Sequence, residues 1–207
     1  MTVLALGLYF VGLVVVFGVR TWVQLRRTGS SGFHGISGEP GSLRWWAGVL
    51  FVLALVLGAV SLVLASTGVT PPPDGEVASA LAVAGVVLTL LGFAGVVAAQ
   101  TGMGTSWRIG VDESERTALV TDGLFAWVRN PIFTAMVATQ AGLTLMVPTG
   151  WSVTALACLV VAVELQVRLI EEPYLLQVHG AAYRAYAEGT GRFVPRLGQL
   201  PTGVVAR

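Results

Sequence analysis

The sequence predicts an all-α integral membrane protein with about five transmembrane helices. Of its 207 residues, 55% are hydrophobic and only 11% are charged, whereas about a quarter of the residues of a soluble domain are charged. The apolar residues are gathered in five long runs, and a helix needs about 20 apolar residues to cross the bilayer core. A soluble helix bundle rarely contains five such runs, so we set that alternative aside.

Turn residues separate the five runs. The prolines at 71–73 require a loop between the second and third runs, and Pro148, Thr149 and Gly150 make the last two runs a tight helical hairpin. The first run has no basic segment before it and no small-residue cleavage site after it, so we interpret it as a retained span. The fourth run would be about 24 Å long as a helix, which is short for a full crossing. The predicted spans are 3–19, 45–65, 77–99, 132–147 and 151–170.

The cationic residues indicate how the chain is oriented in the cell membrane. All twelve are arginine, and they follow the first, third and fifth spans. None lies at the N-terminus, in the 70–75 loop or at the 148–150 turn. Under the positive-inside rule, the N-terminus is outside and the C-terminus is cytoplasmic. A net charge of +1 without a clustered basic face argues against a nucleic-acid partner.

The chain divides near residue 100 into two parts. Residues 1–99 hold the first three helices and a cytoplasmic loop at 20–44, which is rich in glycine and serine and is expected to be a flexible connector. Residues 100–207 hold a polar loop (100–130), the helical hairpin (131–170) and a cytoplasmic tail (171–207). The single cysteine, Cys158, excludes an internal disulfide. Neither His34 nor His179 has a second metal ligand near it in sequence, so no metal site is expected.

Ionisable residues at the end of the fifth span are candidates for chemistry. Glu164 and Arg168 interrupt its apolar run, and Glu171 and Glu172 follow directly. Steps of three and four residues place Glu164, Arg168 and one of the paired glutamates on one helix face. An ionisable group in a span usually faces the bundle interior or a wet cavity. The alternative is that Glu164 and Arg168 only form an ion pair between helices, while the paired glutamates are a solvated helix end.

A second candidate is the segment 117–133, in which aromatic residues lead into Arg129, Asn130 and Pro131. Proline suits the first turn of a helix, so the fourth span is expected to begin at Pro131. Its free amide groups and the positive end of its dipole could then hold a carboxylate or a phosphate. The alternative is a simple arginine anchor and helix start. The tail with Tyr183 and Tyr186 predicts an amphipathic helix at the membrane interface.

The order of these motifs resembles the isoprenylcysteine carboxyl methyltransferase family. G-L-F-x-x-V-R-N-P-x-F lies at 123–133, the hairpin follows, and E-E-x-x-L-x-x-x-x-G-x-x-Y-x-x-Y and R-F-x-P lie at 171–186 and 192–195. The segment 100–108 also resembles bacterial members. The resemblance implies an S-adenosylmethionine-dependent methyltransferase with a cytoplasmic C-terminal cofactor pocket, from which S-adenosylhomocysteine is released. The implied cofactor-binding residues are Thr117, Ala118, Leu119, Val120, Phe125, Arg129, Asn130, Pro131, Ile132, Phe133, Glu171 and Glu172.

These residue types suit the methyl donor. Its amino group and sulfonium favour Glu171 or Glu172, and its carboxylate favours Arg129 and the amides after Pro131. Its adenine favours aromatic residues such as Phe125 and Trp127. The sequence departs from the family at Asn130, where the family has histidine, and at Phe125 and Phe133, where it has tyrosine. Asparagine can position a ligand but cannot titrate.

Because the candidate groups lie at the predicted cytoplasmic ends of apolar helices, we expect a lipophilic methyl acceptor to enter from the bilayer, and the resemblance implies one substrate-binding residue. Arg168 matches the region of a substrate-binding arginine and could hold a carboxylate, whereas Glu164 or Glu172 could accept a proton from a thiol or an amine. Expected partners are therefore membrane lipids and a lipid-like substrate. Two other functions are compatible with the sequence: a membrane reductase with a nicotinamide cofactor, and a non-enzymatic membrane protein with a degenerate methyltransferase fold.

Overall fold

The structure of the chain, a computed structural model, describes residues 1–29, 31, 35–36, 38–104 and 118–201. These residues form helices and connecting segments, with an isolated parallel bridge between Val128 and Gly191. Two of the helical elements, η1 and η4, are π-helical turns, and η3 is a 3₁₀ turn. The elements are α1 (Thr2–Leu13), η1 (Val14–Val19), α2 (Arg20–Thr28), α3 (Leu43–Ser66), α4 (Glu76–Gly102), η3 (Gly123–Ala126), α5 (Pro131–Met146), α6 (Gly150–Gln166), η4 (Val167–Glu171), α7 (Glu172–His179) and α8 (Ala181–Gly189).

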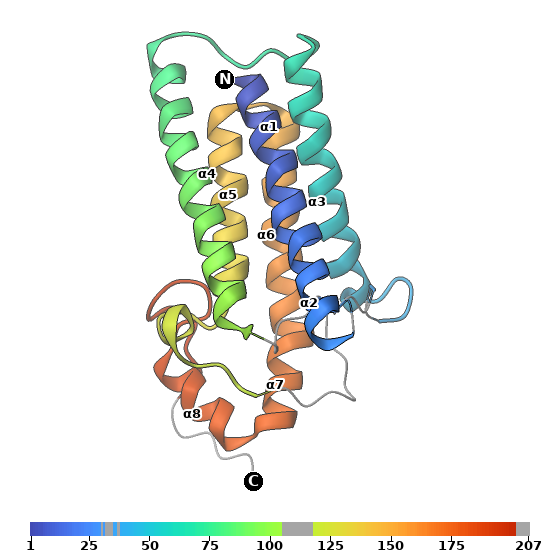
Figure 1. Cartoon of the computed structure of the whole chain (residues 1–207), viewed down its shortest axis with the longest axis vertical. Coiled ribbons are helices and arrows are strands. Elements are labelled where there is room, and N and C mark those ends of the chain that lie inside the picture. The colour runs from blue at the N-terminus through green and yellow to red at the C-terminus, as the bar shows by residue number, and fades with distance from the viewer. Residues whose placement is uncertain (30, 32–34, 37, 105–117, 202–207) are drawn as a thin grey trace.

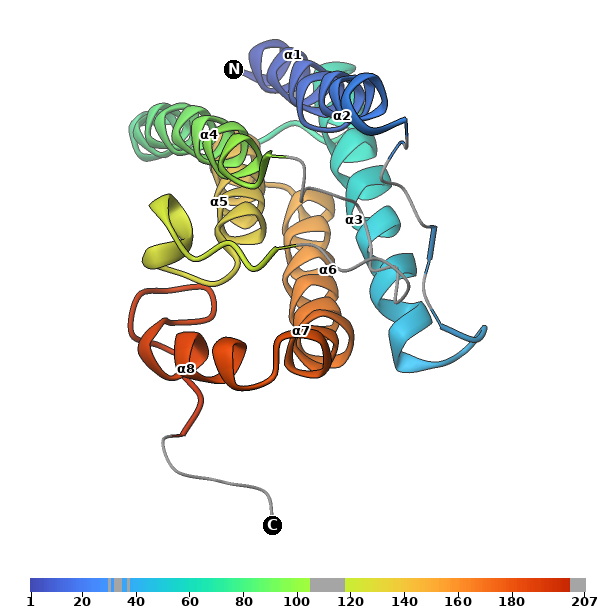
Figure 2. The same cartoon turned by 60° about the horizontal axis from the view of Figure 1, so that its bottom comes forward.

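The long helices stand side by side and run alternately up and down (Figure 1). Helix α4 packs along α5, and α3 packs along α6, while α1 contacts α3 and α5. The N-terminus lies at one end of the bundle, and α2, α7 and α8 lie at the other end, which Figure 2 brings forward. The elements that carry the described arginines are at this second end. Which end faces the cytoplasm stays a prediction.

Four helical stretches are long and apolar enough to cross a membrane: Thr2–Arg26, Leu43–Ser66, Glu76–Gly102 and Gly150–His179. Helix α5 is also apolar but has only 16 residues, about 24 Å. The prediction of an all-helical, multi-pass membrane protein is confirmed with four full-length spans, and the fourth predicted span is the short one. The first and last stretches extend beyond their apolar runs because helix continues through η1 into α2 and through η4 into α7.

Small residues allow α4 and α5 to pack backbone against backbone. A Cβ atom added at Gly142 would lie 2.6 Å from the backbone nitrogen of Thr89, and one added at Gly85 would lie 2.5 Å from the carbonyl oxygen of Gly142. Because lipid is as apolar as the helix surfaces, close packing of this kind is a main source of association between membrane helices. It holds the start of α5 beside the end of α4, where the candidate site lies.

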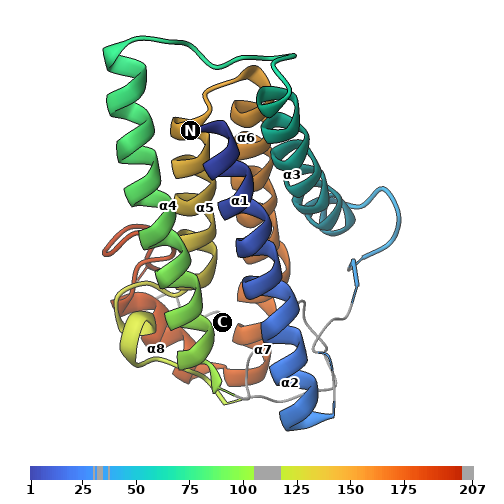
Figure 3. The ribbon, with the colours of Figure 1, turned by 45° about the horizontal axis from the view of Figure 1, so that its top comes forward.

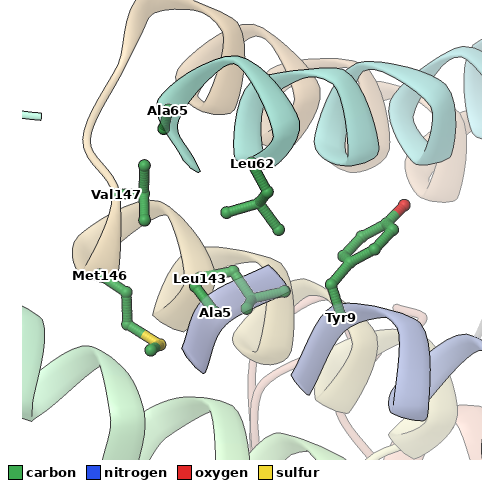
Figure 4. Packing of buried hydrophobic residues seen from close by; sticks show 7 residues of the cluster. All are labelled: Ala5, Tyr9, Leu62, Ala65, Leu143, Met146 and Val147. Carbon is green, nitrogen blue, oxygen red and sulfur yellow. The ribbon is translucent and has the colours of Figure 1, made fainter. Parts of the chain in front are cut away.

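A cluster of buried residues joins α1, α3 and α5 near the opposite end (Figure 4); its members are Ala5, Tyr9, Leu62, Ala65, Leu143, Met146 and Val147. The Tyr9 hydroxyl donates to the carbonyl oxygen of Leu55 at 2.5 Å. The α5–α6 turn is closed by a capping box: Thr149 Oγ1 accepts from the Ser152 amide at 3.2 Å, and Ser152 Oγ accepts from the Thr149 amide at 2.9 Å. These contacts leave few polar groups unsatisfied in the apolar region.

Replacing Gly142 with alanine is expected to destabilise the protein by about 1–3 kcal/mol, because the added methyl group overpacks the α4–α5 contact. The matched control is Gly7→Ala on α1, where an added Cβ meets nothing within 4 Å. Thermal unfolding in detergent micelles, followed by tryptophan fluorescence, measures both. Equal melting temperatures for Gly142→Ala and the unmodified protein would contradict the packing described.

Candidate functional site

A cavity of about 700 Å³ opens at the α7–α8 end of the bundle. One side of its wall is apolar and comes from membrane helices, including Val16 and Phe17 of η1 and Ala47, Phe51 and Leu55 of α3. The segments around α5 and α7 carry the charged groups of the described lining, Arg129 and Glu171, and α2 and α4 add Thr21 and Gln100. The cavity therefore connects a polar mouth with an apolar chamber between the helices.

Many of the residues predicted from the sequence line the cavity: Ala118, Leu119, Val120, Phe125, Arg129, Asn130, Pro131, Ile132, Phe133 and Glu171. Thr117 lies outside the described residues. Glu164, Arg168 and Glu172 are not part of the lining. Trp127, predicted to stack with Phe125 on an adenine, is 69% exposed and also lies outside the lining, whereas Phe125 is buried.

The π turn η4 connects α6 to α7 and ends at Glu171. A π turn aligns residues five apart instead of four, and Gln166 Nε2 lies 3.5 Å from Glu171 Oε1. Both side chains line the cavity. Arg168 instead donates through Nε to Glu164, four residues earlier, and their side chains are 56% and 40% exposed. Glu164 and Arg168 therefore share a helix face, as their spacing predicted, and this pair lies outside the cavity lining.

Glu172 points away from the cavity and binds two arginines. Its Oε1 accepts from Arg129 Nη2 at 2.7 Å and from Arg192 Nε at 2.8 Å, and its Oε2 accepts from Arg192 Nη2 at 2.9 Å. Glu172 is 8% exposed. Charge-assisted bonds of this kind are among the strongest in proteins. We call Arg129, Glu172 and Arg192 the buried charge cluster.

Arg129 also clamps the segment that follows α8. Its Nη1 donates to the carbonyl oxygens of Ala187 at 2.9 Å and Thr190 at 2.5 Å, and its Nη2 donates to that of Gly198 at 3.0 Å. The backbone nitrogen of Arg129 donates to Gly191 at 2.8 Å, and that of Asn130 donates to Arg192 at 3.1 Å. Much of the Arg-Asn-Pro motif thus serves to attach the tail to the start of α5.

One donor of Arg129 is left over. Its Nε is buried and has no hydrogen-bond partner within the part of the chain that the structure describes. A buried donor without a partner costs about 1–3 kcal/mol. Arg129 lines the cavity, and its side chain lies within hydrogen-bonding reach of the Tyr183 hydroxyl.

The surroundings of Tyr186 and Arg192 keep the tyrosine neutral and the arginine charged. Burial raises the pKa of Tyr186 to about 12, although Arg129 partly opposes the shift, and its hydroxyl donates to the carbonyl oxygen of Phe125 at 2.6 Å. The raised pKa stabilises the fold fully below about pH 10, the unfolded value, and this contribution is lost as the pH rises through about 12. The hydrogen bond to Glu172 raises the pKa of Arg192. Neither group is suited to accept a proton at neutral pH.

Sequence reasoning missed several parts of this site. The sequence did not indicate a partner for Arg192 of the R-F-x-P motif. It also did not assign four of the lining residues to the cavity: Gln166, Tyr174, Tyr183 and Tyr186. The α3 wall had no sequence signal, because its residues read as an ordinary apolar span. Among the described residues, no group of three or more His, Cys, Asp or Glu side chains could hold a metal ion.

The fold and the cavity define a multi-pass membrane protein whose polar mouth opens into an apolar chamber. Residues 80–182 match the family model described as phospholipid methyltransferase. The chain belongs through this region to that family of membrane methyltransferases, which confirms the family resemblance predicted from the motifs. The match extends from α4 into α8 and so includes α5, η4 and α7. No significant match was found among curated proteins or among solved structures.

Replacing Glu172 with glutamine is expected to destabilise the protein by about 3–5 kcal/mol, because two guanidinium groups lose their buried counter-charge. Glu164→Gln is the matched control, since it breaks the exposed pair with Arg168 and exposed pairs contribute at most about 1 kcal/mol. Thermal unfolding in detergent compares the two variants. A similar small loss for both would show that the buried charge cluster does not stabilise the mouth.

Proposed function

We propose that the protein transfers a methyl group from S-adenosylmethionine to the amine headgroup of a lipid. The observation that carries this proposal is the cavity itself, which joins polar groups of the mouth to an apolar chamber lined by η1 and α3. A polar methyl donor needs the polar mouth, and a lipophilic acceptor needs the apolar chamber beside it. Membership of a membrane methyltransferase family supports the reaction type.

The mouth offers a partner for each end of the methyl donor. The buried Nε of Arg129 and the amides at the start of α5 can hold its carboxylate. The carboxylate of Glu171 can balance its positive charge. Phe125 and Phe133 offer an aromatic wall for the adenine. Asn130 donates through Nδ2 to the carbonyl oxygen of Arg192 at 3.1 Å. Its role in this proposal is to position the tail segment around Arg192.

The charges in the lining favour an amine over a carboxylate as the acceptor. The charged side chains in the described lining are Arg129 and Glu171, and Arg129 already binds Glu172 and three backbone carbonyls. Arg168, expected to hold an acceptor carboxylate, binds Glu164 instead. Glu171 can attract a lipid ammonium group and accept its proton, which leaves the nitrogen lone pair free to react.

The chain contributes alignment and exclusion of water more than covalent chemistry. S-adenosylmethionine, when bound, supplies a methyl group on a sulfonium, and its displacement needs an in-line nucleophile. The apolar wall of Ala47, Phe51 and Leu55 can hold the lipid chains, so that the headgroup faces the mouth. Burial of Phe125 and of the charge cluster keeps bulk water from that side of the reacting groups.

Calorimetric titration of the detergent-purified protein with S-adenosylhomocysteine tests the donor site. We expect binding by the unmodified protein and by the control Glu164→Gln, and at least about a tenfold weaker affinity for Glu171→Gln, a loss of about 1.4 kcal/mol. NADPH should not bind. Binding of NADPH alone would support a membrane reductase, and binding of neither ligand would support a non-enzymatic protein.

Transfer of a radiolabelled methyl group in reconstituted vesicles tests the acceptor. Vesicles of phosphatidylcholine with phosphatidylethanolamine present a reactive amine, and vesicles of phosphatidylcholine with N-acetyl-S-farnesylcysteine present a carboxylate without one. The proposal predicts labelled phosphatidylethanolamine products and loss of labelling in Glu171→Gln. Labelling of the farnesylated cysteine alone would contradict an amine acceptor but would leave the methyltransferase reaction standing.

A further inference from the structure

The segment that follows α8, residues 190–198, returns to the side of the bundle instead of continuing away from it (Figures 1 and 3). The carbonyl oxygen of Phe193 accepts from Thr134 Oγ1, in the first turn of α5, at 2.9 Å. The Phe193 side chain packs against the buried cluster of Ala54, Leu159 and Val163. These residues belong to the apolar parts of α3 and α6, so Phe193 reaches membrane depth.

Other groups of the protein form hydrogen bonds to the backbone of residues 190–198. A loop in water would not need them, because water could form these bonds. The carbonyl groups of Thr190, Gly191, Arg192 and Phe193 accept hydrogen bonds from Arg129, Asn130 and Thr134. Within the segment, Val194 accepts from the amide of Leu197, and Leu197 accepts from that of Arg192. Irregular backbone is tolerated at membrane depth only where protein groups satisfy it in this way.

Two large apolar side chains on the same segment have little protein contact: Val194 is 51% exposed and Leu197 is 64% exposed. The bridge between Val128 and Gly191 joins the segment to the η3 region, where Trp127 is 69% and Leu124 is 42% exposed. Tryptophan is enriched where the bilayer meets water. Two neighbouring segments at the level of the first turns of α5 therefore expose apolar residues.

We propose that residues 190–198 are an interfacial anchor, with Val194 and Leu197 inserted into the lipid leaflet at this end of the bundle. Arg196, between them, has a positive φ of 66°, and its long side chain can reach the headgroup phosphates. The anchor holds Arg192 at the membrane surface, and Arg192 contacts the cavity wall through Glu172 and Arg129. This inference is independent of the methyl-transfer reaction.

Depth-dependent fluorescence quenching tests the anchor in the full-length protein. In a Cys158→Ala background, single cysteines at Val194 and Leu197 are labelled with an environment-sensitive fluorophore in nanodiscs of phosphatidylcholine and phosphatidylglycerol. Leu91→Cys, 65% exposed on α4, is the lipid control, and Asp74→Cys, in the exposed α3–α4 loop, is the water control. Thermal unfolding checks that each labelled variant is folded, and the two positions serve as independent replicates.

Labels at Val194 and Leu197 should be quenched more by doxyl groups on the lipid acyl chains than by iodide, as at Leu91. Stronger quenching by iodide, as at Asp74, would overturn the anchor and place the segment in water. Protection from both quenchers, with cross-linking between copies, would also overturn it by assigning the surface to a second copy of the chain.

Discussion

The buried carboxylate of Glu172 is the contact on which the polar end of the molecule depends. It binds Arg129, from the segment before α5, and Arg192, from the segment after α8. Two guanidinium groups at one buried site would repel each other without it. Arg129 then extends the contact to the carbonyl groups of Ala187, Thr190 and Gly198. One carboxylate thus joins three segments that are far apart in the sequence, and two of them, around Arg129 and around α7, line the cavity.

The same arrangement explains why two adjacent glutamates have different surroundings. Glu172 is used for structure, whereas Glu171 lines the cavity beside Gln166. Adjacent residues of a helix point in different directions, so Glu171 can face the cavity while Glu172 binds the two arginines. A second π turn, η1, lies across the cavity, where Val16 and Phe17 line the apolar chamber. The carbonyl oxygen of Val16 accepts from Gln100 Nε2 at 3.1 Å.

The helices could be predicted from the sequence because their signals are local. Apolar length marked the spans, and Pro131 and Thr149 marked the starts of α5 and α6. Most of the cavity residues between Ala118 and Phe133 were also predicted, because the motif around Arg129 is continuous in the chain. The π turns have no sequence signature of this kind, so the contact between Gln166 and Glu171, five residues apart, could not be predicted. The partners of Arg129 and Arg192 depend on the return of the tail, which only the tertiary structure defines.

We infer that the buried charge cluster, of which Arg129 lines the cavity and Arg192 does not, holds the segments around the site proposed for the methyl donor. The direct measurement is a calorimetric titration of the Arg192→Gln and Arg196→Gln variants with S-adenosylhomocysteine. Arg192 binds Glu172 and does not line the cavity, whereas Arg196 is exposed four residues later. We expect at least about a tenfold loss of affinity for Arg192→Gln, or about 1.4 kcal/mol, with Arg196→Gln unchanged. Unchanged affinity in both variants would contradict this inference.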